Sequence, residues 1–188
     1  MTPARPTDHS IPATLDEVLR WTAADHAPPG TPAATTMRLL VALLRLEAGA
    51  RADTLKRLHA ATVDAGGGPE SPAWGALVAA LGELLERANY REIGGAELQE
   101  AFEEEAKEAV LAWAFLNAHG PASERTLDER IERWIHERTG RHCDFEVDDA
   151  VAKIARLGLA ARAGETWTAT APDAAAAGLR ARWDAAAG

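Results

Sequence analysis

The 188-residue sequence contains a single cysteine, Cys143, and few aromatic residues. One cysteine cannot form an intrachain disulfide, which excludes a fold held together by disulfides. Aromatic residues make up 5% of the chain, and six of them are tryptophans. Because the abundant alanines bury little surface, the core must rest on Leu, Val, Ile and these tryptophans. Alanine is also the best helix former, so the composition favours a helical protein.

The chain also lacks an excess of basic residues. Its net charge is −9, and both halves are acidic: residues 1–105 hold 9 basic and 16 acidic residues, and residues 106–188 hold 11 and 13. Nucleic-acid binding draws most of its affinity from Lys and Arg that neutralise phosphates. Anionic membrane surfaces attract basic segments in the same way. Nucleic acid is therefore disfavoured as a partner.

No apolar run approaches the roughly 20 residues that a membrane-spanning helix needs. The run from Leu39 to Leu44, for example, ends at Arg45. Residues 1–10 contain Asp8 and no apolar stretch, so a secretory signal is not expected. We expect a cytoplasmic protein with no membrane span.

Signatures of cofactor chemistry are missing as well. The glycines 66–68 precede Pro69 and lack the Lys and Ser/Thr of a phosphate-binding loop. A carboxylate metal site of the helix-bundle kind could be suggested by Glu103, Glu104, Glu105 and Glu108, but no Glu-x-x-His pattern lies on the same helix. A solvated helix face with a Glu103–Lys107 surface pair is therefore favoured. We expect no cofactor and no enzyme activity.

His136, His142, Cys143 and Asp144 are metal-ligand types that lie close in sequence. Zinc sites use paired clusters with tight spacing, whereas only one loose cluster is present, so surface positions are favoured. Nothing marks a base or an oxyanion donor for Cys143 as a nucleophile. The acidic residues 144–149 suit the start of a helix, where Asp144 or Glu146 would cap and the charges would offset the macrodipole.

Helical periodicity covers most of the amino-terminal half. Residues 1–13 are expected to form a loose tail, and Thr14 caps the first helix. The next helix, residues 34–48, is apolar on two sides, which predicts a central helix with Leu40 and Leu44 buried. Leu55, Leu58 and Thr62 indicate a further helix, either separate from it or continuous with it across Gly49. A further helix begins at Ser71.

A long helix is predicted from about residue 96 to 117. Residues 97–118 contain no Gly or Pro, and their apolar residues recur at helical spacing along one face. We expect this helix to join an amino-terminal helical domain, residues 14–105, to a carboxyl-terminal domain, residues 106–188. A break at residues 103–107 would contradict this interpretation.

The carboxyl-terminal pattern is helix, helix, helix and hairpin. One helix starts with a Thr126-x-x-Glu129 capping box, the next runs over residues 147–157 and ends at Gly158, and residues 159–170 form a hairpin. A last helix covers residues 173–187. This order predicts a mainly α protein that ends in a winged-helix-like module with a small β-hairpin.

Several stretches resemble, in order, the transmembrane-protein-143-like domain family. They are IPATLDEVLRWTAAD, LLVALLRLEAGARADTLKRLH, LLERANYREIGGAELQEAF, KEAVLAWAFL, TLDERIERWI and CDFEVDDAVAKIARLGLA. The family has no established activity. Its members carry a long, partly strand-rich and partly hydrophobic middle region, whereas only residues 103–106 separate Phe102 from Lys107 here. The resemblance therefore implies neither catalytic residues nor membrane association for this chain.

These observations favour a non-catalytic interaction or scaffold protein that contacts a protein partner or a second copy of itself. The alternative is a DNA-binding regulator that uses the same winged-helix module, although the helix at residues 147–157 offers only Lys153 and Arg156 to DNA. The candidate contact residues are Lys153, Arg156, Arg162 and Trp167, the last of which would alternatively close the hairpin onto the core.

Overall fold

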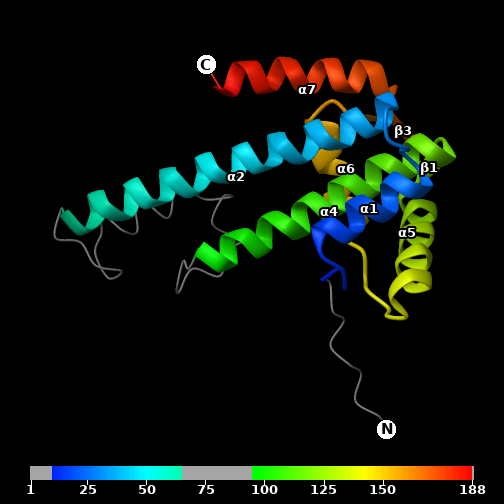
Figure 1. Cartoon of the computed structure of the whole chain (residues 1–188), viewed down its shortest axis with the longest axis horizontal. Coiled ribbons are helices and arrows are strands. Elements are labelled where there is room, and N and C mark those ends of the chain that lie inside the picture. Colours follow the sequence, from blue (N-terminus) through cyan, green and yellow to red (C-terminus); the bar gives the residue numbers. More distant parts are fainter. Residues whose placement is uncertain (1–9, 65–94, 188) are drawn as a thin grey trace, which may run out of the picture. The chain divides into compact units, whose positions relative to one another are not determined.

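A computed structural model describes residues 10–64 and 95–187 of the chain. It confirms a mainly helical fold with a small sheet (Figure 1). In chain order the elements are α1 (Leu15–Asp25), α2 (Pro32–Asp64), α4 (Gly95–His119), β1 (Ala122–Ser123), α5 (Glu124–Thr139), α6 (Val147–Arg156), β2 (Ala160–Ala163), β3 (Thr166–Ala169) and α7 (Pro172–Ala187). The helix expected to begin at Ser71 lies outside the described residues.

The contacts divide the chain into two compact units, residues 1–44 with 102–188 and residues 45–101. This grouping does not coincide with the expected division at residue 105, because the first helices pack with the carboxyl-terminal elements. The side-chain contacts described below all lie in the first unit.

The centre of the first unit is the second half of α4. Every residue from Ala109 through Leu116 is at most 3% exposed. Three alanines and five larger side chains make up this stretch, and their burial shows that other parts of the chain cover the helix on every side. The helix runs without interruption from Gly95 to His119, as the sequence predicts, but its apolar surface is wider than the single predicted stripe.

Helix α1 begins where the sequence indicates. The Thr14 side chain accepts a hydrogen bond from the Glu17 amide, and the Glu17 carboxylate accepts one from the Thr14 amide at 2.9 Å. This reciprocal capping satisfies donors that the first turn leaves open. The helix then buries Leu15, Val18 and Thr22.

The segment before α1 is fastened to α4 by a buried lysine. Lys107 is 3% exposed, and its Nζ donates to the carbonyls of Ile11 at 3.1 Å and Ala13 at 2.9 Å. Glu104, the carboxylate that pairs with Lys107, also accepts from Ser10 Oγ at 3.0 Å. Lys107, which was expected on a solvated face, is therefore buried, because the segment that leads into α1 covers this side of α4; α1 lies beside α4 in Figure 1.

Helix α2 confirms the predicted burial of Leu40 and Leu44, which are 0% and 3% exposed. The helix continues across Gly49 to Asp64, as one helix rather than two. It starts two residues earlier than predicted, at Pro32, and the Ala34 amide donates to Thr31 Oγ1 at 3.2 Å.

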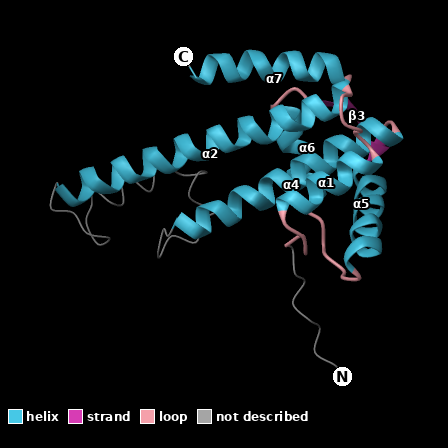
Figure 2. Ribbon diagram, viewed as in Figure 1, coloured by secondary structure: helices cyan, strands magenta, loops and turns pink. Residues whose placement is uncertain are grey.

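The predicted hairpin is present as β2 and β3, and a strand that the sequence analysis missed completes a three-stranded antiparallel sheet in the order β1-β3-β2. The strands, magenta in Figure 2, are short beside the helices. Strand β1 pairs Ala122 with Trp167. The same short segment supplies the cap of α5: Ser123 Oγ accepts from the Thr126 amide at 3.2 Å. The predicted cap at Thr126 was therefore wrong, because the helix begins two residues earlier, at Glu124.

Candidate interaction surface

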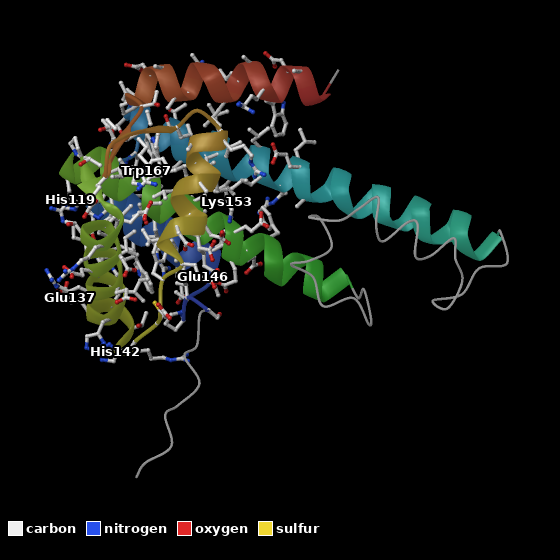
Figure 3. The ribbon with its side chains drawn as sticks, turned by 180° about the vertical axis from the view of Figure 1, so that it is seen from behind. His119, Glu137, His142, Glu146, Lys153 and Trp167 are labelled. Atoms are coloured by element: carbon white, nitrogen blue, oxygen red, sulfur yellow. The ribbon has the colours of Figure 1, made fainter. Side chains whose placement is uncertain are left out.

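Helix α6 presents a small and weakly charged outer face. Asp148, Ala152 and Arg156 are exposed at intervals of four residues, while Val151 and Ile154 are buried. Successive exposed positions thus carry one acid, one methyl group and one base. The helix start is acidic, with Glu146 as its N-cap residue and Asp148 in its first turn (Figure 3). The Glu146 side chain does not cap the helix, contrary to one of the two capping alternatives.

Lys153 is not part of this outer face. It is 7% exposed, and its Nζ donates to Glu108 Oε2 of α4 at 3.1 Å. The interpretation of Glu108 as a solvated surface residue was wrong, since its side chain is 13% exposed and lies against α6. Burial raises the pKa of Glu108, and the ammonium of Lys153 opposes this shift. This pair ties α6 to α4 and is unavailable to a partner.

Trp167 closes the hairpin onto helix α5. The side chain is 7% exposed, and its Nε1 donates to Glu124 Oε1 at 3.0 Å. The guanidinium of Arg162 lies 5.6 Å from the centre of the Trp167 ring and 3.5 Å from Glu124 Oε1. The tryptophan is thus held between a carboxylate and a cation, in the core-closing position that the sequence analysis gave as the alternative.

Of the four candidate contact residues, the structure leaves Arg156 and Arg162 exposed. Arg162 is oriented by Glu124 and by the carbonyl of Gly164, to which its Nε donates at 2.9 Å. Arg182 of α7 donates to the carbonyl of Arg156 at 2.9 Å. Three exposed arginines therefore come from α6, the hairpin and α7, each on a different element.

The histidines near Cys143 stack on one another. The rings of His136 and His142 lie 4.1 Å apart and nearly parallel, at 14°. Within the described residues no group of three His, Cys, Asp or Glu side chains is arranged to hold a metal ion. Cys143 is buried, and this burial, reinforced by the carboxylates of Glu132 and Asp144, raises its pKa to about 11. A thiol with such a pKa stays protonated near neutral pH, which makes it a poor nucleophile.

One face of α5 concentrates negative charge beside this thiol. Asp128 has a pKa raised to about 6, first by burial and then by the carboxylates of Glu132, Asp144 and Glu129. Its Oδ1 atom is buried without a hydrogen-bond partner. The neighbouring Glu132 does have a partner: its Oε1 accepts a hydrogen bond from the amide of Phe145 at 3.1 Å, which anchors the loop before α6. The arrangement places like charges around a partly buried acid, which lowers the stability of the fold when Asp128 is ionised.

Sequence reasoning missed the role of Glu108 and of Glu124. A usable signal existed for the first: between Ala106 and Leu116, Lys107 and Glu108 are the only charged residues in an otherwise apolar stretch. Charges in such a stretch need buried partners. Glu124 carried no such signal, because its role depends on a hairpin 43 residues away.

Comparison of the chain with models of known protein families, with curated proteins and with solved structures gave no match. Among the helices of the described residues, none combines the length and the apolar character that a membrane span requires.

Proposed function

We propose that α4 to β3 form a winged helix that binds protein rather than DNA, in a non-catalytic interaction or scaffold role. The element order α4-β1-α5-α6-β2-β3 and the sheet order β1-β3-β2 support this classification. In such a module α6 takes the place of the recognition helix, and the β2–β3 hairpin is the wing.

The observation that carries the preference for protein is the outer face of α6. A DNA-reading helix presents Arg, Lys, Asn or Gln to base edges and meets phosphates with positive charge. Here Asp148 and Ala152 occupy two of the exposed positions, and Lys153 is sequestered by Glu108. The short side chains of Asp148 and Ala152 leave room for close packing against another protein surface. The resemblance to a family without known activity agrees with a non-catalytic role.

The alternative, a DNA-binding regulator, is favoured by exposed arginines on three neighbouring elements, Arg156, Arg162 and Arg182. A mobility-shift titration of the full chain with random duplex DNA at low salt separates the two proposals. Non-specific DNA binders reach dissociation constants of about 1–100 μM through contacts to phosphates. Because the start of α6 is acidic and Lys153 is buried, we expect no shift at protein concentrations of about 10 μM. Micromolar binding that weakens steeply with salt, and that the R156E/R162E variant abolishes, would replace our proposal with the alternative.

Sedimentation velocity of the same protein tests whether the partner is a second copy of the chain. We expect that any self-association through α6 is weakened by Ala152→Arg, which places a long charged side chain at the centre of the outer face. Arg125→Ala is the matched control, since Arg125 is an exposed residue of α5. Self-association that responds equally to both changes would place the interface elsewhere.

A further inference from the structure

A histidine lies among aromatic rings where α1 ends. The centre of the His26 ring lies 4.6 Å from that of Phe115 and 5.2 Å from that of His119, both on α4, and 6.2 Å from that of Trp134 on α5. The Nε2 atom of His26 is buried and has no hydrogen-bond partner. A protonated ring would need an acceptor at this nitrogen, and leaving the buried N–H unpaired is costly. The surroundings therefore suit the neutral imidazole.

The charged groups around His26 give the same result. Asp25 is the carboxylate that faces it, and this carboxylate already accepts from Trp134 Nε1 at 2.8 Å and pairs with Arg138. The Arg138 guanidinium lies 4.2 Å from the centre of the Trp134 ring. A proton on His26 would thus face a fixed cation and the imidazole of His119, while Asp25 is shared with two other donors. Burial lowers the pKa of His26, His119 and Arg138 act in the same direction, and Asp25 opposes them.

We propose that His26 is a pH-sensitive latch that holds the end of α1 against α4 and α5 when neutral and releases it when protonated. The two ends of α1 are fastened by different chemistry. At the start, Lys107 and Glu104 bind the backbone of Ile11, and neither contact involves His26. Release therefore begins at the His26 end and uncovers the buried face of α1, including Val18. The device goes beyond the proposed function, since it would make an additional apolar surface available under acidic conditions.

Hydrogen exchange measured by mass spectrometry on the full chain tests this latch. Exchange is followed at pH 7.5 and 5.5, corrected for the pH dependence of the intrinsic rate, in peptides that cover residues 15–25 and 109–116. We expect the opening equilibrium of α1 to rise at least about threefold at the lower pH, and by no more than about tenfold per pH unit, which is the limit for one linked proton. The central α4 peptide should change by less than about twofold, because its opening requires the whole unit to unfold.

Two variants separate His26 from its neighbours. His26→Phe keeps an aromatic ring but cannot be protonated, so α1 should open equally at both pH values. His119→Gln removes the adjacent imidazole and leaves His26, so the pH response should remain. An unchanged response in His26→Phe, or an equal loss of protection in both peptides of the wild type, would overturn the proposal. Should His26→Phe fail to fold, an NMR titration of His26 in the wild type decides, since a pKa at or above the ordinary value of about 6.5 contradicts the latch.

Discussion

Replacement of Asp128 by Asn should stabilise the protein at neutral pH and leave its stability unchanged in acid. Asp128 has a pKa raised from 3.8 to about 6 by burial and by neighbouring carboxylates. The folded state therefore binds a proton more readily than the unfolded chain between these values. Ionised Asp128 begins to lower the free energy of unfolding as the pH rises above 3.8, and the full loss is reached above about pH 6. Asparagine removes the charge at nearly constant shape.

The size of the gain follows from the shift. A rise of about two in the pKa of Asp128 corresponds to a free energy of about 3 kcal/mol, at 1.36 kcal/mol for each pKa unit. Asp128 is partly exposed, so solvent screens the repulsion from Glu132 and Asp144, and we expect a gain of about 1 kcal/mol. For a protein of this length, that gain corresponds to an increase in Tm of about 3 °C.

Urea and thermal denaturation followed by circular dichroism at pH 7.5 and 4.0 provide the measurement. Glu137→Gln is the matched control, because it removes an exposed acid of the same helix that is not among the carboxylates acting on Asp128. The control should change stability by less than about 0.5 kcal/mol at either pH. A gain in Asp128→Asn that is equally large at pH 4.0 would refute the electrostatic explanation, since the wild-type carboxyl is largely protonated there.

Three further outcomes are expected from other parts of the unit. Lys153→Met should lower the free energy of unfolding by about 3 kcal/mol because it leaves Glu108 buried and unpaired, whereas the E108Q/K153M double variant should recover most of this loss in urea denaturation. Gly158→Ala should lower the free energy of unfolding by about 1 kcal/mol, because Gly158 has a φ of +76°. Gly178→Ala should raise it by about 0.5–1 kcal/mol, because Gly178 lies in the interior of α7 with open space for the new methyl group. Thermal melts of the two variants test whether the changes have opposite signs. The thiol of Cys143 should react with Ellman's reagent at pH 8 at least about a hundredfold more slowly in the folded protein than in urea, because of its burial and its pKa of about 11, and fast labelling of the folded protein would contradict this.

The elements that the sequence predicted well are those determined by local chemistry. Thr14 and Glu17 form a cap within one turn, and Gly158 ends α6 because a positive φ is accessible to glycine. The continuity of α4 follows from a run of good helix formers. Strand β1, in contrast, has two residues and no periodicity, and its existence depends on the distant partner Trp167. No window of local sequence contains that information.

The candidate contact residues show the same division. Exposed Arg156 and Arg162 occupy the positions that the helical and strand patterns predict. Lys153 has a charge that suggests the surface, yet its partner Glu108 lies 45 residues away on another helix. A lone charged residue on an apolar helix face can lie at the surface or be buried against an opposite charge. The sequence of its own helix does not distinguish the two, because the partner belongs to another helix. Pairing across the fold, rather than residue type, decided the outcome.

The two adjacent charges of α4 explain why this helix is the centre of the unit. Lys107 binds backbone carbonyls that precede α1, and Glu108 binds the lysine of α6. Apolar contacts between alanine-rich helices would tolerate sliding, because small side chains offer few distinct fits. A buried ion pair is stable at one register only, since any shift leaves a charge without its partner. Lys107 and Glu108 therefore fix where α1 and α6 sit along α4, and in doing so they set the position of both His26 and the outer face of α6.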